Sequence, residues 1–187
     1  MFNGGMMSVP GHRSTALFIA GVVVASSATA LGWTATASAG PAPKFDPVVA
    51  QLKSGSLSGR VEFVPLDETV LIEASFTGLD PREQYSASIH EFVTAAGKGC
   101  EGVGRLLDPM DLSKSPAYRP DPADFATAAV GDLTAKFGRF EADRNGEFEF
   151  RGIDSTFSVN DLVGRRSFML DGPDGATCAT IERMPQG

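Results

Sequence analysis

Apolar and polar residues alternate in several short runs, and a period of two is typical of β-strands. The runs lie at Arg60–Val64, Thr69–Phe76, Tyr85–Phe92, Gly138–Ala142, Glu147–Arg151, Arg165–Leu170 and Ala176–Arg183. Clusters of turn residues separate them, and helical periodicity is weak. The pattern predicts an all-β domain, built as an antiparallel sandwich or barrel.

Two turns and one long loop shape this prediction. Asn145-Gly146 stands between two alternating runs and predicts a β-hairpin over Gly138–Arg151. A second turn cluster at Asp171–Gly175 joins the last two runs. Between Val93 and Ala129, glycines and prolines break the pattern repeatedly, so we expect a long irregular loop with a short helical turn within Asp121–Ala129.

The first residues have the features of a secretory leader. Ala16–Ala25 is an apolar core, and Ala37-Ser38-Ala39 fits the small-x-small pattern that a signal peptidase accepts. We therefore predict a signal peptide over 1–39, with a retained membrane anchor as the alternative. A linker with a possible first strand over 40–54 and one β-domain over 55–187 would follow. The expected location is outside the cytoplasm, either secreted or in the periplasm or cell envelope.

Export has consequences for the cysteines and the charge. Cys100 and Cys178 are the only two cysteines, so an oxidising compartment favours one intramolecular disulfide, with two free thiols as the alternative. The chain has a net charge of −7, and removal of the leader with its one Arg brings this to −8. An acidic protein repels nucleic acid and anionic lipid, so we expect neither as a partner.

The order of these pieces resembles that of the Cu/Zn superoxide dismutases. The matching pieces are Thr77-Gly78-Leu79, Ile89-His90-Glu91-Phe92, Cys100, Gly104, Asp108-Pro109, Val130-Gly131-Asp132-Leu133, Gly164-Arg165 and Cys178. The resemblance extends from about Gly55 to Ile181. It implies a Greek-key β-barrel, copper and zinc cofactors, superoxide dismutation, a disulfide between the two cysteines, and a dimer as an open option.

The metal ligands of that family are largely missing here. In the family, a strand with the sequence His-Val-His-Glu-Phe supplies two copper ligands; here Ser88 stands at the first of these positions and His90 at the second. Leu106 and Leu170 stand where the family has two further copper histidines. The zinc aspartate is matched by Asp132. Redox copper in the family needs four imidazoles, and His90 is the one histidine after residue 39. We therefore expect no copper and no zinc, and Leu106 packed against Leu170 in place of the metal.

His90 and Asp132 remain as relict metal ligands, each with a structural alternative. His90 is otherwise a hydrogen-bonded histidine at the barrel surface, and Asp132 closes a turn through its own backbone. The methionines Met110, Met169 and Met184 carry thioethers that suit Cu(I), but their wide spacing favours core packing.

The leading hypothesis is thus an exported superoxide dismutase-like domain without catalysis. It would act as a binding or structural module for an unknown protein or small-molecule partner. The alternative is a superoxide dismutase, or a metal-handling protein, with ligands recruited otherwise.

Overall fold

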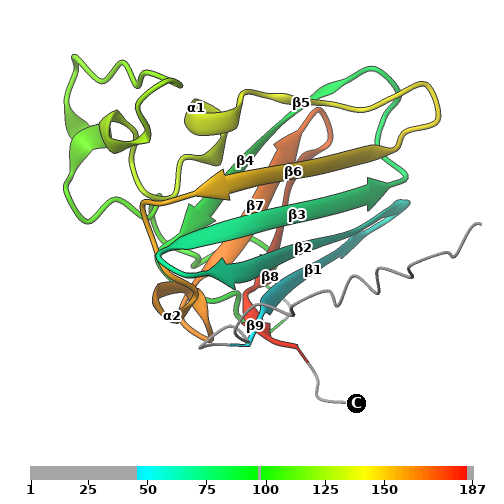
Figure 1. The fold of residues 1–187 in the computed structure, drawn as a ribbon. Coiled ribbons are helices and arrows are strands. Elements are labelled where there is room, and N and C mark those ends of the chain that lie inside the picture. Colours follow the sequence, from blue (N-terminus) through cyan, green and yellow to red (C-terminus); the bar gives the residue numbers. More distant parts are fainter. Residues whose placement is uncertain (1–45, 97, 185–187) are drawn as a thin grey trace, which may run out of the picture. The chain divides into compact units, whose positions relative to one another are not determined.

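A computed structural model of the chain describes residues 46–96 and 98–184 (Figure 1). Within these residues the elements are β1 (Val48–Ser54), β2 (Leu57–Leu66), β3 (Thr69–Thr77), β4 (Gln84–His90), η1 (Leu112–Lys114), η2 (Phe125–Thr127), α1 (Leu133–Phe137), β5 (Phe140–Glu141), β6 (Phe148–Asp154), α2 (Val159–Leu162), β7 (Ser167–Gly172), β8 (Gly175–Thr180) and β9 (Glu182–Arg183). The predicted signal peptide lies outside the described residues.

The strands form two antiparallel sheets that pack face to face (Figure 1). One sheet has the order β6-β3-β2-β1-β9, and the other has the order β5-β4-β7-β8. Strands β3 and β6 are neighbours although β4 and β5 lie between them in sequence, which gives the non-sequential strand order of a Greek key. The predicted all-β Greek-key sandwich is confirmed. None of the helices in the described ranges is long and apolar enough to cross a membrane.

Alternation explains which side of each strand is buried. In β3 the side chains of Val70, Ile72, Ala74 and Phe76 all enter the core between the sheets. Burial of a large apolar side chain of this kind stabilises the fold by about 1.5–3 kcal/mol relative to exposure. The period of two that predicts the strand therefore also supplies the driving force for sheet packing.

An aromatic series closes the side of the sandwich where β5 and β6 diverge. Phe140 of β5 lies 4.7 Å, centroid to centroid, from Phe148 and 5.4 Å from Phe150, both on β6 of the other sheet. Phe137 of α1 lies 5.1 Å from Phe150, and Phe125 of the loop lies 5.0 Å from Phe137. Edge-to-face and offset contacts at these separations are favourable. The series ties the long loop to both sheets.

The hairpin predicted around Asn145-Gly146 is wrong, although its turn forms. The Asp143 backbone N–H donates to the Glu147 carbonyl at 2.9 Å, and the Asp143 carboxylate accepts from the Asn145 and Glu147 N–H groups. The flanking strands then separate: β5 pairs with β4, and β6 pairs with β3. The turn crosses between sheets because Leu79 donates to the Gly146 carbonyl and takes the place of a hairpin partner.

The remaining local predictions are mostly confirmed. The two runs around Asp171–Gly175 form the paired strands β7 and β8. The segment Val93–Ala129 is irregular where it is described, with η2 as its predicted helical turn. The short helices α1 and α2 were not predicted. Strand β1 lies inside the segment 40–54, for which a linker with a possible first strand was expected, and it pairs along its whole length with β2.

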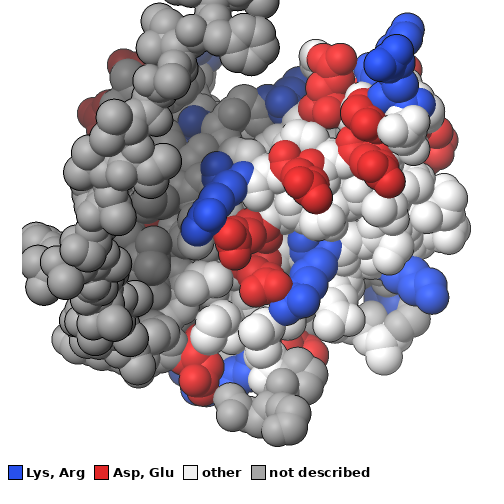
Figure 2. Space-filling model, turned by 45° about the vertical axis from the view of Figure 1, so that its right-hand side comes forward, with Lys and Arg blue, Asp and Glu red and all other residues white. Residues whose placement is uncertain are grey.

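Charged side chains of both signs are interspersed over the described face shown in Figure 2, and no single-sign patch is visible there. On the outer side of the five-stranded sheet, Arg60 pairs with Glu62, and Arg151 pairs with Glu73 at 3.2 Å. Exposed pairs of this kind contribute only about 0–1 kcal/mol each. They make this face mixed in charge in an acidic protein.

Candidate functional site

The residues singled out from the sequence map mainly to one surface, which we name the His90 face. Directly opposed residues of antiparallel strands point to the same side of a sheet. In register across β4, β7 and β8 lie Ser86, Asp171 and Ala176, then Ser88, Met169 and Cys178, then His90, Ser167 and Thr180. The intervening residues Ala87, Ile89, Phe168 and Leu170 enter the core. The His90 face is therefore the side of this sheet that points away from the core.

The two ring nitrogens of His90 have different partners. Nδ1 lies 3.1 Å from the carbonyl oxygen of Gly104, and Nε2 lies 3.0 Å from Oγ of Ser88. A carbonyl oxygen can only accept, so Nδ1 carries the proton in the neutral ring. Nε2 then keeps its lone pair and accepts from the Ser88 hydroxyl. His90 is thus hydrogen-bonded at the barrel surface, with a lone pair directed along β4.

The expectation that Leu106 packs against Leu170 is wrong. Leu170 pairs in register with Ala87 and belongs to the core cluster. Leu106 instead forms an isolated antiparallel bridge with His90, so it lies on the other side of the sheet. A shift of one residue in register moves a side chain to the opposite face. Met169 therefore takes the place on the His90 face that the sequence comparison assigned to Leu170.

Asp132 has a structural role at the end of the long loop. One carboxylate oxygen accepts from the Ala135 N–H at 2.9 Å and caps α1, and the other accepts from the Tyr118 hydroxyl at 3.1 Å. The Tyr118 oxygen in turn accepts from the Ala129 N–H at 2.9 Å. Burial raises the pKa of Tyr118, so the phenol remains a donor across the physiological range. A single side chain thereby joins the middle of the loop to its end.

Replacement of Tyr118 by Phe should remove two hydrogen bonds while preserving the ring. We expect a loss of about 1–3 kcal/mol in the free energy of unfolding, because the Ala129 N–H and one oxygen of Asp132 lose their partner. Urea unfolding followed by circular dichroism measures this change. Phe125→Leu, which alters the loop contact but no hydrogen bond, serves as the comparison. An unchanged midpoint for Tyr118→Phe would show that the loop does not depend on this hydroxyl.

Backbone hydrogen bonds fix the middle of the long loop, and the residues that directly follow it, to β4. Ile89 donates to the Gly131 carbonyl at 2.8 Å, Gly131 donates to Leu107 at 2.7 Å, and Leu107 donates to Ile89 at 2.8 Å. A Cβ on Gly131 would lie 2.2 Å from the Ile89 carbonyl oxygen, so only glycine allows this approach. Leu107 within the loop and Gly131 just after it therefore meet on one residue of β4, Ile89.

The disulfide expected between Cys100 and Cys178 is present, with the two Cα atoms 5.2 Å apart. It ties the start of the long loop to β8. Thr94, a few residues before Cys100, also hydrogen-bonds to Thr180 through its N–H and its hydroxyl. These contacts hold the loop over one end of the His90 face.

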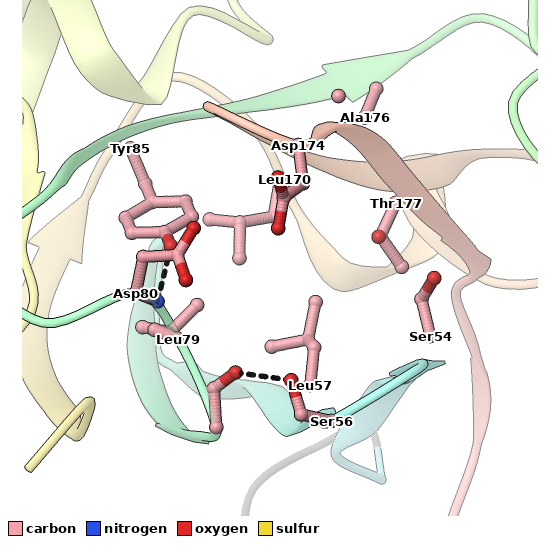
Figure 3. A pocket seen from close by; sticks show the side chains of 12 residues that line it. Ser54, Ser56, Leu57, Leu79, Asp80, Tyr85, Leu170, Asp174, Ala176 and Thr177 are labelled. Atoms are coloured by element: carbon pink, nitrogen blue, oxygen red, sulfur yellow. Dashed lines mark hydrogen bonds between the residues drawn. The ribbon is translucent and has the colours of Figure 1, made fainter.

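A small polar pocket of about 110 Å³ lies at one end of the sandwich, and sequence reasoning did not indicate it (Figure 3). The Tyr85 hydroxyl accepts there from the Asp80 N–H at 2.8 Å, and Ser56 donates to the Gly78 carbonyl. Leu170 lines this pocket, in agreement with its place on the core side of β7. Its hydroxyls come from turns and strand ends, which a local sequence pattern does not bring together.

The wide spacing of the three methionines favoured packing in the core, and this prediction is wrong. Met110 is 74 % exposed, Met169 and Met184 are partly exposed, and none of the three belongs to the core cluster. Across residues 46–96 and 98–184, no group of three or more His, Cys, Asp or Glu side chains is close enough to hold a metal ion. Neither His90 nor Asp132 therefore belongs to such a group within the described ranges.

The chain is similar in sequence to a known protein. Over 141 residues the chain is 33 % identical to the copper chaperone for superoxide dismutase, chloroplastic/cytosolic, of Arabidopsis thaliana. The match covers 72 % of this chain and 39 % of that protein, so the chain spans about two fifths of its curated relative. The domain is Cu/Zn superoxide dismutase-like. No family model matches the chain.

Solved structures support the same fold for this superoxide dismutase-like domain. The crystal structure of the clock protein EA4 superposes with a TM-score of 0.59 at 23 % identity. It covers 74 % of this chain, and the chain covers 95 % of it. At this identity the likeness shows a shared fold.

The residues present do not fit the copper centre that the resemblance implies. Four imidazoles are required, and the superoxide dismutase-like domain offers only His90. Leu106 contributes no ligand atom, Leu170 faces the core, and Ser88 binds His90. The His90 face instead carries one imidazole, that of His90, together with the thioether of Met169 and the carboxylate of Asp171.

Proposed function

We propose that this chain is an exported, catalytically inactive superoxide dismutase-like module that lacks resident copper and zinc and acts by binding another protein. The observation that carries the proposal is the donor set: His90 is the one imidazole of the domain, whereas dismutation at copper uses four. Fold and chemistry are separable, and the retained sandwich does not supply the missing ligands. Export rests on the apolar leader sequence, and the disulfide agrees with an oxidising compartment.

The contacts of the long loop support folding without a metal ion. The Asp108 carboxylate accepts from the Ser113 hydroxyl at 2.6 Å and from the Ser113 and Leu112 N–H groups. Burial raises the pKa of Asp108, but the hydrogen bonds from Ser113 and Leu112 outweigh it and leave the pKa lowered. Together with Tyr118 and Cys100, these contacts provide the anchoring that a bound ion would otherwise contribute.

Metal removal should therefore leave stability unchanged. We expect equal thermal midpoints for the protein in buffer, in excess EDTA, and after dialysis against EDTA, because no described contact of the loop requires an ion. The same samples, after incubation with copper and zinc and removal of free metal, should show no superoxide dismutation above a metal-free blank. A Cu/Zn superoxide dismutase treated in parallel is the positive control.

Two results would overturn this proposal. A fall of several degrees in EDTA would mean that a structural ion holds the loop. Catalytic dismutation with stoichiometric bound copper would mean that ligands are recruited from elsewhere, for example at a contact between two copies.

A second candidate function is copper handling. It is favoured by the similarity to a protein named as a copper chaperone for superoxide dismutase. On this reading the ion is cargo, and the protein partner is the molecule that receives it.

A further inference from the structure

The polar pocket of Figure 3 is a second place where a ligand could bind. It lies near the start of β4, at Tyr85, whereas His90 is the last residue of that strand and does not line the pocket. The volume of the pocket is about 110 Å³. An apolar cavity of about 150 Å³ holds benzene, so this pocket suits a group of about five non-hydrogen atoms.

One part of the pocket wall is apolar. Leu79 and Leu170 are buried, and Leu57 is partly buried. In Figure 3, Leu57 and Leu170 point toward one another across the pocket. Each methylene group of a ligand that leaves water for such a surface strengthens binding by a factor of about two to four. The leucines therefore favour a ligand with a short alkyl stem.

The polar part of the wall presents oxygen acceptors. Tyr85 is 7 % exposed, and its hydroxyl oxygen accepts from the Asp80 N–H at 2.8 Å. Burial raises the pKa of Tyr85, and the negative charges of Asp80 and Asp174 raise it further, so both carboxylates lie near the phenol. No ion pair among the described residues includes either carboxylate. Two carboxylates without a basic partner favour a cation in the pocket.

These acceptors are held in place by the fold. A Cβ at Gly172 would lie 2.2 Å from Cε1 of Tyr85, so the glycine makes room for the ring beside β7. The Tyr85 hydroxyl in turn holds the N–H of Asp80. Asp174 stands in the two-residue turn between Gly172 and Gly175, which are paired in register. Groups that are already positioned lose little freedom when a ligand binds.

We propose that this pocket binds a primary alkylammonium group, with the ammonium at Asp80, Asp174 and the Tyr85 oxygen and the alkyl stem against the leucines. A primary ammonium has three N–H donors and no acceptor, which matches three acceptor groups. The carboxylates repel an anion. In the part of the chain that the structure describes, no group of three or more His, Cys, Asp or Glu side chains is close enough to hold a metal ion.

Two kinds of molecule carry this chemistry, namely a small free amine and the lysine side chain of another protein. Each fits the size of the pocket when about four carbon atoms precede the nitrogen. The inference goes beyond the proposed function, because the pocket would bind a free amine without any protein partner.

The experiment is a titration of the ¹⁵N-labelled protein with n-butylammonium, followed by the amide resonances in nuclear magnetic resonance. We expect saturable shifts at Asp80, Gly175 and Thr177, which line the pocket. Butyrate and n-butanol have similar alkyl stems but a negative charge or no charge, and they should cause no saturable shift. Methylammonium lacks three methylene groups and should bind about tenfold more weakly or less.

Variants test the two carboxylates. Asp80→Asn and Asp174→Asn should each weaken butylammonium binding by about threefold, and the double variant by about tenfold, since each carboxylate is exposed and its charge is screened. Asp171→Asn is the matched control, because it removes one negative charge from the same β7–β8 hairpin at a position that does not line the pocket. It should bind like the parent. Equal thermal midpoints establish that the variants are folded.

A parallel titration with Nα-acetyl-lysine methylamide distinguishes the two sources of the ammonium. Binding as tight as that of butylammonium assigns the pocket to a lysine side chain, and weaker binding assigns it to a free amine. The inference is overturned if the shifts with butylammonium do not saturate, if butyrate or butanol reproduces them, or if the Asp80→Asn, Asp174→Asn double variant binds like Asp171→Asn. Such a failure leaves the EDTA and dismutation tests of the proposed function unaffected.

Discussion

Replacement of Lys136 by Met should destabilise the protein by about 3–5 kcal/mol, the range found when one partner of a buried ion pair is removed. The ammonium of Lys136 lies 2.8 Å from the Asp154 carboxylate, and both side chains have no exposed surface. It also donates to the Val130 carbonyl at 2.7 Å and to the Thr156 hydroxyl at 2.6 Å. The variant would leave Asp154 charged and buried without its counter-ion.

Burial lowers the pKa of Lys136, and the hydrogen bond and charge of Asp154 oppose that shift. The ammonium group also lies 5.5 Å from the centre of the Phe157 ring. All three of its N–H bonds are occupied, which links α1, the end of the long loop and the end of β6. The ion pair of Lys136 and Asp154 therefore holds these segments together, and the Lys136 ammonium has no N–H left to donate to a substrate.

Urea unfolding followed by circular dichroism tests this prediction. Lys114→Met is the control: Lys114 pairs with Asp111 at 2.7 Å, but both side chains are more than half exposed, so the loss should be about 0–1 kcal/mol. The double variant Lys136→Met, Asp154→Leu should regain much of the lost stability, since no lone buried charge remains. Similar small losses for Lys136→Met and Lys114→Met would contradict the buried pair.

The strands could be predicted from the sequence, but their assignment to sheets could not. The period of two located β3, β4 and β7 because each of these strands buries one face. Asn145-Gly146 forms a tight turn as its sequence indicates, yet β5 and β6 enter different sheets. The assignment of β5 and β6 to different sheets depends on Leu79, more than sixty residues away, whose N–H donates to the Gly146 carbonyl. A local pattern contains no information about such a partner.

In the candidate site, too, the sequence predicts the strand in which a residue lies but not its partner across the sheet. His90 is placed correctly because one strand and its alternation define it. Counting from Gly164-Arg165 selected Leu170 as its neighbour, whereas the register selects Met169. One residue of error exchanges a core leucine for a thioether on the His90 face. The burial of Ser167 and Lys136 could not be predicted for a related reason, because tertiary packing determines which polar side chains are buried.

Removal of the disulfide by Cys100→Ser with Cys178→Ser should lower the free energy of unfolding by about 4–5 kcal/mol on the chain-entropy model. The two cysteines are separated by 78 positions, so the bond restricts a large part of the unfolded chain. The folded loop keeps its other attachments, namely the backbone bonds of Gly131 and the hydroxyl of Tyr118. We therefore expect a folded but less stable protein, and no selective loosening of β8.

The stability loss and the bond itself are measured separately. Non-reducing mass spectrometry of the parent should give a mass lower by two hydrogen atoms than that of the reduced protein, with no alkylatable thiol. Cys100→Ala with Cys178→Ala controls for the polarity of serine, and it should show the same loss in urea. The reduced parent should unfold at the midpoint of the two double variants, because in each case only the covalent link is missing. If the oxidised parent and the double variants unfold at the same urea concentration, the link does not stabilise the domain, and the long loop is held by its hydrogen bonds alone.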